Sequence, residues 1–499
     1  MASFYIENFG CRATQADGAA LERQFLERGL ERAGAAHDAE IVVLNTCTVT
    51  EGADKDARAS IRRLQRVNPD CRILVTGCYA QRAPEELAAL PGVTWVVGNS
   101  HKHQAAQIAT ASTSGFVSLA QLAGISQSPP FRTERERVGH SPGDLGRERW
   151  SEGQADNVFV GDIFAHTELL AAPVFEAANE RTRPNLKVQD GCDNRCSFCV
   201  IPYVRGQSRS LPMERVLAEV RTLVAAGYRE VVISGINLGR WGRDLSVVGR
   251  QSLVVSGQGS PKILPSLEAH PERLTTNDQR LVTLIRAILD RTSLEKLRIS
   301  SVEPMDWSDE LICLVASSNR IAKHAHVPMQ SGSDAVLRRM HRKYRPWHYR
   351  EKIQKLRSAM PTAAIGADVM VGFPGETVAE FDETRRMIEE LPFTYLHVFT
   401  YSPRPGTPAA AHSGQVPVAV ARERNQVLRR IASSKKAAFM GTLVGTMVEA
   451  ITLQSSTPEF TEALSENYLK MKVSGQHKAN QWLAVKVEGV SGETLVGDV

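Results

Sequence analysis

The sequence of 499 residues contains no apolar run that approaches the ~20 residues a membrane-spanning helix needs. Its first ten residues lack a basic start followed by an apolar core, so no secretory signal peptide is predicted. These two absences argue against a membrane-embedded or secreted protein. The sequence therefore predicts a cytoplasmic location.

Cysteine is scarce, with eight residues in the whole chain. Thiols stay reduced in the cytoplasm, so these cysteines are predicted to be metal ligands or core residues before they are disulfides. Charge of neither sign dominates, because 60 basic and 55 acidic residues leave a net charge of +5. Such an excess is compatible with nucleic-acid binding, but many soluble enzymes carry it too.

Hydrophobic residues make up 42% of the chain and charged residues 23%, which excludes a disordered composition; the length suggests about three domains. Strand and helix patterns alternate through a predicted N-terminal domain at residues 1–104. Such alternation favours an α/β fold, here a flavodoxin-like parallel sheet. The predicted strands are 4–8, 40–45, 72–76 and 94–97, and the predicted helices are 16–28 and 51–67.

A second alternation of strands and helices is predicted at residues 181–415. Six strand–helix units suit a partial (β/α)6 barrel, whose chemistry lies at the carboxyl ends of the strands. Residues 105–180 carry little core and are interpreted as a linker with an insertion, and residues 246–277 as an insertion loop. The predicted strands are 186–189, 230–234, 296–300, 324–328, 365–371 and 396–400.

The pattern changes again toward the C-terminus. Residues 416–440 are predicted to form a basic helical connector, and residues 441–499 a small β-barrel of short strands. Its predicted strands include 447–452, 468–473, 482–488 and 494–496.

Three cysteines, Cys192, Cys196 and Cys199, fall within eight residues directly after a predicted strand. Thiolates are soft ligands suited to zinc or to iron–sulfur clusters. Structural zinc requires four ligands, and no fourth Cys or His lies nearby in the sequence. A four-iron cluster with one open iron is therefore favoured over a zinc loop or a chance arrangement.

The spacing Cys-x-x-x-Cys-x-x-Cys after a first barrel strand resembles the radical S-adenosylmethionine (SAM) superfamily. The resemblance implies that SAM chelates the open iron, and that one electron then cleaves it to a 5′-deoxyadenosyl radical. Phe198 matches the aromatic residue that is usual beside the last ligand.

Three further cysteines, Cys11, Cys47 and Cys78, each follow a predicted strand of the N-terminal domain. The carboxyl ends of parallel strands share one edge of the sheet, where open α/β sheets bind ligands. Three thiolates could converge there on a second cluster. The spacing alone is explained equally well by three separate buried cysteines near loops.

Longer strings resemble the methylthiotransferase family of that superfamily, and the match covers most of the chain outside 105–180 and 246–277. The resemblance implies a second 4Fe–4S cluster on Cys11, Cys47 and Cys78, and a TRAM-like RNA-binding domain at the C-terminus. The similar strings are 8–15 (NFGCRATQ), 45–50 (NTCTVT), 76–81 (TGCYAQ), 326–334 (HVPMQSGSD), 366–377 (GADVMVGFPGET) and 401–408 (YSPRPGTP).

The resemblance also implies contacts to SAM at the strand ends, although ordinary loop polarity explains each of these residues as well. Ser234 and Gly235 stand where the superfamily usually has Gly-Gly-Glu. The expected contacts are Phe198, Ser234, Gly235, Ser300, Ser301, Glu303, Gln330 and Asp368.

The strings at 45–50, 76–81 and 205–210 (RGQSRS) favour the family type that acts on N6-threonylcarbamoyladenosine 37 of tRNA. The resemblance implies insertion of a methylthio group at C2 of that base, with the tRNA anticodon loop and a flavodoxin or ferredoxin as partners. The isopentenyladenosine-tRNA type and the type that modifies a ribosomal-protein aspartate are alternatives. A non-enzymatic alternative is an iron–sulfur protein that binds RNA or senses redox state.

A basic run at 338–357 includes Tyr344 and Trp347. Its cations could bind phosphates and its aromatic rings could stack on unpaired bases. A solvated helix face explains the same run equally well.

Overall fold

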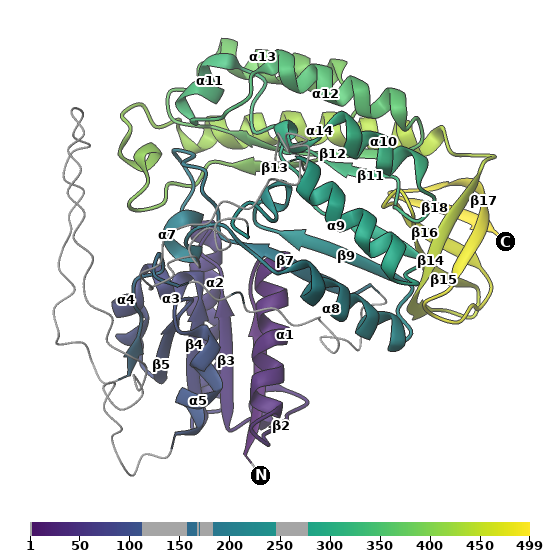
Figure 1. Cartoon of the computed structure of the whole chain (residues 1–499). Helices are drawn as coiled ribbons and strands as arrows, with labels where there is room; N and C mark the ends of the chain where they lie inside the picture. Colours follow the sequence, from purple (N-terminus) through teal and green to yellow (C-terminus); the bar gives the residue numbers. More distant parts are fainter. Residues whose placement is uncertain (1, 112–156, 167–168, 170–182, 246–277) are drawn as a thin grey trace, which may run out of the picture.

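A computed structural model describes residues 2–111, 157–166, 169, 183–245 and 278–499. In Figure 1 the chain forms an N-terminal sheet domain in purple, a central domain in teal and green, and a small yellow barrel beside it. Most of the predicted linker and all of the predicted insertion 246–277 lie outside the described residues. Within the described part, no helix is long and apolar enough to cross a membrane.

The N-terminal domain is built on a parallel sheet of order β2-β1-β3-β4-β5-β6. Its strand β3 (Ile41–Thr46) is buried along its whole length, as expected of a parallel strand covered on both faces. The order of β1 to β5 is that of a flavodoxin-like sheet, so this predicted architecture is confirmed. The other strands are β1 (Ser3–Asn8), β2 (Glu31–Arg32), β4 (Arg72–Gly77), β5 (Val93–Gly98) and β6 (Val158–Phe159).

Helices on both faces of this sheet form two apolar cores. Helices α1 (Arg12–Leu26) and α5 (Ala105–Thr110) pack on one face, and α2 (Glu51–Val67) packs on the other. The Thr50 side chain accepts a hydrogen bond from Ala53 N at 3.2 Å, which fixes the start of α2 where the sequence predicts it. Because α5 and β6 join this domain, it extends past the predicted boundary at residue 104.

Six parallel strands follow in the central domain, at the positions the sequence predicts. They form two sheets, β10-β9-β7-β8 and β11-β12-β13, and an isolated parallel bridge between Leu297 and Ile321 lies between the two. The short antiparallel β8 (Arg209–Ser210) was not predicted, because its two residues are a strand only through their pairing with β7. The six strands are β7 (Asn185–Asp190), β9 (Glu230–Gly235), β10 (Lys296–Ile299), β11 (His324–His326), β12 (Ala364–Val371) and β13 (Tyr395–Thr400).

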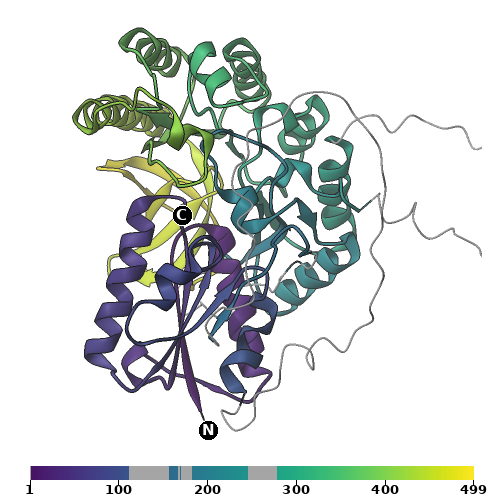
Figure 2. The same ribbon diagram turned by 90° about the vertical axis from the view of Figure 1, so that its left-hand side faces the viewer.

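Helices surround the central strands and pack with them into the largest core of the protein. In Figure 2 these helices form a teal and green outer rim above the purple N-terminal domain. This arrangement agrees with the predicted partial barrel. The helices include α8 (Met213–Ala225), α9 (Asp278–Arg291), α10 (Asp309–Ser317), α11 (Asp334–Arg339), α12 (Pro346–Ala359) and α13 (Val378–Glu390).

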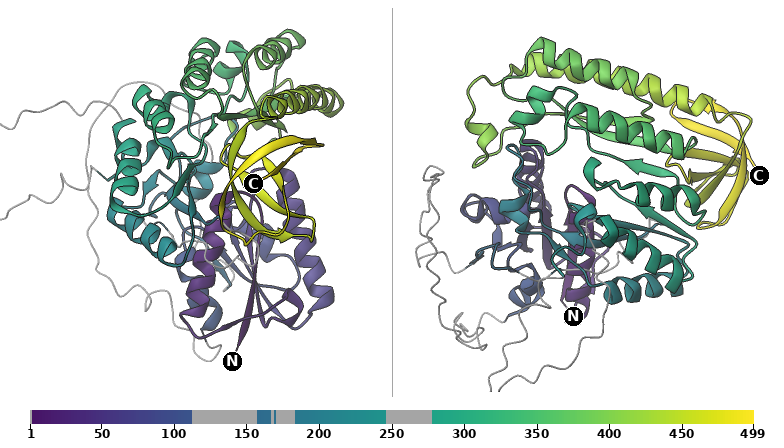
Figure 3. Two further views of the ribbon diagram at one scale, coloured as in Figure 1. Left: turned by 90° about the vertical axis from the view of Figure 1, so that its right-hand side faces the viewer. Right: turned by 45° about the horizontal axis from the view of Figure 1, so that its top comes forward.

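The long helix α14 (Val418–Gly441) leads to a closed barrel of order β14-β15-β16-β18-β17, seen in yellow in Figure 3. Met440 and Leu443, at and just after the end of the helix, pack into the core of the barrel. The predicted small barrel is thus confirmed, with β15 as a strand that was not predicted. The strands are β14 (Met447–Ser456), β15 (Phe460–Ser465), β16 (Lys470–Ser474), β17 (Trp482–Ser491) and β18 (Thr494–Asp498).

The three parts of the chain touch one another around the ends of α1 and β7. Asn185 Nδ2 donates to the Arg12 carbonyl at 3.1 Å, and so ties the central domain to the N-terminal one. Arg298 Nη1 donates to the Glu466 carbonyl at 3.0 Å, and so ties it to the barrel. Arg12 Nη2 also donates to the Tyr468 hydroxyl at 2.9 Å, which joins the first domain directly to the last.

Candidate active site

A cavity of about 540 Å³ reaches the carboxyl ends of the central strands and is also lined by His324 and Tyr395 at the starts of β11 and β13. Its volume lies in the range of small-molecule sites, and its position is the one at which (β/α) barrels carry their chemistry. Cys192, Cys196 and Cys199 line it together with Cys11 of the N-terminal domain. One cavity therefore brings together cysteines from both of the predicted triplets.

The first triplet lies on the loop between β7 and α7 (Ile201–Arg205). Gly191, which opens this loop, has φ +70°, and a Cβ there would stand 1.9 Å from the Gln207 carbonyl oxygen. Only glycine fits this turn, and the turn directs Cys192 into the cavity. Asn194 N and Asn237 Nδ2 point at the Cys192 sulfur, at 3.4 and 3.7 Å.

Burial, and next the neighbouring Cys196, raise the pKa of the Cys199 thiol to about 12. Burial likewise raises the pKa of Cys192. Buried thiols this close together ionise when a cation compensates their charge, which iron supplies in a cluster. Within the described residues, no three His, Cys, Asp or Glu side chains lie close enough to hold a single metal ion.

The second triplet follows three adjacent strands of the N-terminal sheet. Cys11 directly precedes α1 in the short loop after β1, Cys47 follows β3, and Cys78 opens α3 (Cys78–Arg82) directly after β4. A Cβ at Gly10 would stand 2.8 Å from the Cys47 sulfur, so the Cys11 loop passes directly over Cys47. Burial, and next Cys78, raise the pKa of Cys47 to about 12. The predicted convergence of these strand ends is therefore present in the structure.

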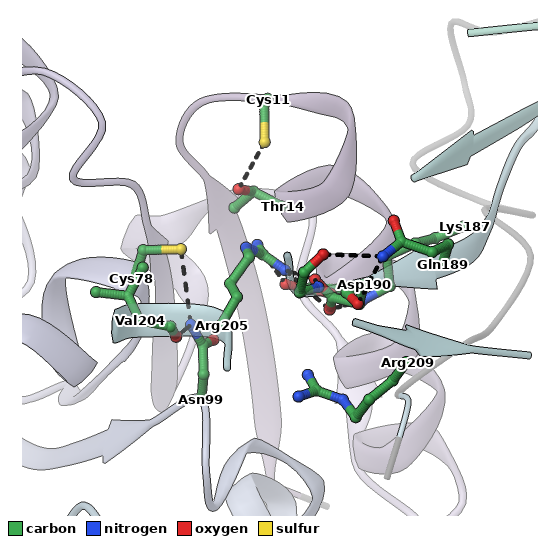
Figure 4. A network of polar contacts seen from close by, with 12 residues as sticks. Cys11, Thr14, Cys78, Asn99, Lys187, Gln189, Asp190, Val204, Arg205 and Arg209 are labelled. Carbon is green, nitrogen blue, oxygen red and sulfur yellow. Dashed lines mark hydrogen bonds and ion pairs between the residues drawn. The ribbon is translucent and has the colours of Figure 1, made fainter. Parts of the chain in front are cut away.

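A buried ion network lies near Cys11 and Cys78 (Figure 4). The Arg205 guanidinium donates to Asp190 at 3.0 Å and to Asp17 at 2.9 Å. Lys187 bonds both carboxylates, and Lys102 Nζ lies 2.9 Å from Asp17. Burial alone would raise the pKa of Asp17, but Arg205, Lys102 and Lys187 hold it below its ordinary value. The carboxylate is therefore ionised, and the network joins α1 to β7 and to the end of α7.

All eight residues predicted to contact SAM line the cavity. The hydroxyl oxygens of Ser234 and Ser300 are buried there without a hydrogen-bond partner in the protein. Asn237 adds a third unpartnered oxygen, Oδ1, which the sequence analysis did not single out. Buried polar atoms normally have partners, so these three are suited to a polar ligand in the cavity.

Glu303 does not extend into the cavity as a free carboxylate. It forms an ion pair with Arg342, whose Nη1 also lies 3.4 Å from the Cys196 sulfur. Arg342 belongs to the basic run that was considered for RNA binding, yet it is buried beside the cysteine loop. A guanidinium in this place stabilises negative charge on the Cys196 sulfur.

Two aromatic residues of that basic run differ in how exposed they are. Tyr344 is only 1% exposed and donates its hydroxyl to the Met329 carbonyl at 2.6 Å, so it cannot stack on a base. Trp347 is 56% exposed on α12 and remains available for such stacking. The basic run therefore contains both a core residue, Tyr344, and a solvent-exposed residue, Trp347.

The opposite wall of the cavity carries residues that the sequence analysis did not identify as a site. They come from all three parts of the chain, so no local string could have grouped them. They are Arg12, His324, His326, Tyr395, His397 and Tyr468.

Comparison with known proteins places this geometry in a family. A model described as "Uncharacterized protein family UPF0004" matches residues 3–98, and one for the Radical SAM superfamily matches residues 186–388. "Threonylcarbamoyladenosine tRNA methylthiotransferase MtaB" of Bacillus subtilis (strain 168) is 34% identical over 95% of this chain and 91% of its own. The chain belongs to the radical SAM methylthiotransferases. The resemblance predicted from the sequence is thus confirmed.

Other relatives in this family carry two kinds of name. The MtaB of Rickettsia prowazekii (strain Madrid E) is 31% identical over 97% of this chain and 94% of its own. "tRNA-2-methylthio-N(6)-dimethylallyladenosine synthase" of Erythrobacter litoralis (strain HTCC2594) is 30% identical over 90% and 86%. The radical SAM methyltransferase TsrM from Kitasatospora setae superposes with a TM-score of 0.50 at 15% identity, over 82% of this chain and 75% of that one. That likeness shows the fold alone.

Radical SAM methylthiotransferases use SAM and 4Fe–4S clusters, and the cavity suits both kinds of group. Its thiols are of the soft type that binds iron–sulfur clusters, and Cys192, Cys196 and Cys199 line it within one loop. Its unpartnered oxygens at Ser234, Asn237 and Ser300 suit the polar groups of a nucleoside or an amino acid.

Proposed function

We propose that this enzyme inserts a methylthio group at C2 of N6-threonylcarbamoyladenosine 37 in the anticodon loop of tRNA. Cys192, Cys196 and Cys199 hold the 4Fe–4S cluster that binds SAM, and Cys11, Cys47 and Cys78 hold a second one. A flavodoxin or ferredoxin supplies the electron in the cytoplasm. The names of the most similar relatives support the choice of substrate.

The observation that carries this proposal is the position of Cys11. It lines the same cavity as the three cysteines of the central domain, although its two partner cysteines lie behind it in the N-terminal sheet. A sulfur group activated at one triplet could therefore meet a radical generated at the other without leaving the cavity. A protein that only bound RNA would have no need for this convergence.

The bound clusters and SAM would supply the radical that removes hydrogen from the base and the sulfur that replaces it. The residues of the chain bind and orient these groups. Phe198 and Gly235 line the floor beside the cluster loop, and Ser234 and Ser300 offer free oxygens to the nucleoside. Ser301 bonds His326 at 2.6 Å, and Gln330 and Asp368 line the wall beyond it.

Three cysteine variants test the assignment of the two triplets. Reconstituted Cys196→Ala protein is expected to lose 5′-deoxyadenosine formation with dithionite and SAM while it keeps iron at the N-terminal site. Cys47→Ala is expected to keep 5′-deoxyadenosine formation but to yield no methylthio product. Cys313→Ala is the matched control, because Cys313 lies exposed on α10. Undiminished SAM cleavage by Cys196→Ala would overturn the assignment.

The substrate is tested in cells. Mass spectrometry of tRNA nucleosides should show that the methylthio group on threonylcarbamoyladenosine disappears when the gene is deleted and returns with the wild-type gene. Loss of the methylthio group from isopentenyladenosine instead would favour the function named for the Erythrobacter relative. No change in either nucleoside would refute the tRNA proposal.

A further inference from the structure

The cavity wall opposite the cluster loop has a distinct composition of one cation and several aromatic or imidazole rings. We propose that Arg12 and Tyr468 form a subsite that binds the carboxylate of the threonylcarbamoyl group, and that His326, Tyr395 and His397 flank the rest of the modified base. This inference rests on the proposed function, since it concerns what that substrate carries. A threonine joined through its amine keeps a free carboxylate, whereas an isopentenyl group has no charge.

Arg12 has the properties of an anion-binding residue. It lines the cavity at the start of α1, and within the described part of the chain its guanidinium donates one hydrogen bond, to the Tyr468 hydroxyl. Among the described residues, no carboxylate forms an ion pair with it, in contrast to the paired Arg205 and Arg342 nearby. An arginine held in this way keeps most of its donors for a planar anion.

The charge around Tyr468 is positive as well. The guanidinium carbons of Arg12, Arg183 and Arg298 lie 5.9, 5.8 and 5.3 Å from the centre of its ring. Glu230 is the carboxylate that pairs with both Arg183 and Arg298. Two of these three cations thus share one acidic partner and Arg12 has none among the described residues, so an anionic substrate group would offset the remaining charge. Asp368 also lines the cavity, with Oδ1 3.4 Å from His326 Nε2.

The position of Tyr468 is held by the barrel. It lies in the turn between β15 and β16 with φ +69°, a conformation that is strained for an aromatic residue. Asn467 anchors the turn to the central domain through a hydrogen bond from Nδ2 to the Thr362 carbonyl at 3.2 Å. Strain of this kind persists where the surrounding structure fixes a residue for function. Here it directs the Tyr468 hydroxyl toward Arg12 inside the cavity.

The rings beside this pair suit a planar base. His326, Tyr395 and His397 lie with ring centres 5.2 to 6.0 Å apart, and all three line the cavity. His326 Nε2 makes no hydrogen bond within the protein, and its nearest charged neighbour is Asp368 Oδ1 at 3.4 Å. The wall thus combines apolar ring surface with an arginine, which together match a purine that carries a carboxylate.

The test compares an acid with a neutral analogue. Anticodon stem-loop RNAs carry threonylcarbamoyladenosine or its methylamide, in which the carboxylate is neutralised. Their binding is measured by fluorescence anisotropy without reductant, and their methylthiolation with it. The wild type is expected to bind the acid about 10- to 100-fold more tightly than the methylamide, because a charge-assisted hydrogen bond is lost. Equal affinity for the two RNAs would overturn the subsite.

Three variants at two positions show which residues cause the preference for the acid. Arg12→Gln should bind the acid as weakly as the methylamide, and Arg12→Lys should restore part of the preference. Tyr468→Phe, which lies far from Cys11 in the sequence, should weaken acid binding about 2- to 10-fold by releasing Arg12. Arg28→Gln is the matched control, because Arg28 is exposed just beyond the other end of α1. Equal iron contents in all variants exclude an effect through the neighbouring Cys11.

Failure of the subsite differs from failure of the proposed function. If the wild type methylthiolates both RNAs equally well, and Arg12→Gln does the same, the function stands and the subsite is wrong. If Arg12→Gln weakens the binding of acid and methylamide by the same factor, Arg12 has only a structural role and the subsite is again wrong. If the wild type methylthiolates neither RNA, the proposed substrate is wrong and the subsite falls with it.

Discussion

At the scale of single residues, Asp17 has the most unusual surroundings. It is 2% exposed and bonds three cations, Lys102, Lys187 and Arg205, which come from two domains. Burying a charged carboxylate costs a large desolvation free energy, and well-placed ion-pair partners offset this cost. Removing the carboxylate alone would leave three buried cations with Asp190 as their nearest remaining acidic partner.

Replacing Asp17 with Asn should lower the free energy of unfolding by about 3–5 kcal/mol, because it leaves buried charge without compensation. The folded protein holds the pKa of Asp17 below its ordinary value of 3.8. Its stabilising effect is therefore complete above pH 3.8 and is lost as the pH falls further. Urea unfolding of wild type and Asp17→Asn at several pH values measures this difference.

The control for this variant is Asp56→Asn on the exposed side of α2, which should change stability by less than about 0.5 kcal/mol. If the difference in unfolding free energy between wild type and Asp17→Asn grew as the pH fell, the pKa of Asp17 would have to be raised in the folded protein. That result would contradict the lowered pKa assigned to this carboxylate.

At the scale of elements, the sequence was informative where burial is continuous. Strand β3 is buried at every position, and α2 has a side-chain cap, so both were predicted within a residue of their observed bounds. Cys47 and Cys78 could be placed at one sheet edge for the same reason, since each directly follows a largely buried strand, and Cys11 lies in the loop just after β1. Strand β8 escaped prediction, because its two residues form a strand only by pairing with β7.

The joint between β4 and α3 leads to a prediction about Gly77. Its φ is +102°, and a Cβ would stand 2.3 Å from the Thr46 carbonyl oxygen and 2.6 Å from Thr46 N. These are backbone atoms of the central strand β3, which cannot move aside. Gly77→Ala should therefore displace Cys78, lower the free energy of unfolding by about 2–4 kcal/mol and reduce iron bound at the N-terminal triplet.

Thermal unfolding and iron analysis of the reconstituted protein measure both effects. Gly52→Ala in α2 is the matched control, because the one atom near its Cβ position is Thr50 Oγ1 at 3.8 Å. That change should be neutral or stabilise the protein by about 0.5–1 kcal/mol. Normal iron content in Gly77→Ala would show that the strand end tolerates the added methyl group.

At the scale of the whole molecule, the cavity depends on how three domains meet. Arg12 and Tyr468 are 456 positions apart in the chain and touch through one hydrogen bond. No periodicity or spacing carries such a contact, which explains why the cysteine side of the site was predicted and its opposite wall was not. The positions of the cysteines are determined by strand ends close to them in the sequence. The opposite wall of the cavity forms only when the domains dock.

The contact between barrel and central domain depends on Lys296 in β10. Its Nζ lies 2.6 Å from Glu449, 3.4 Å from Glu466 and 2.7 Å from the Asn319 carbonyl. Lys296→Met keeps the apolar stem but removes these bonds, which should weaken docking by about 1–3 kcal/mol. Because Tyr468 reaches the cavity through this docking, the variant should bind threonylcarbamoyladenosine RNA more weakly while it keeps the iron content of the wild type.

Limited digestion with chymotrypsin, which does not cut at lysine, measures docking independently of RNA. Cleavage near the end of α14 should be faster in Lys296→Met than in the wild type, because a loosened barrel exposes that segment more often. Lys478→Met, which changes an exposed lysine of the barrel, should be cleaved at the wild-type rate. If Lys296→Met is also cleaved at that rate and binds the RNA normally, the barrel is held by its other contacts, and Lys296 does not control the shape of the cavity.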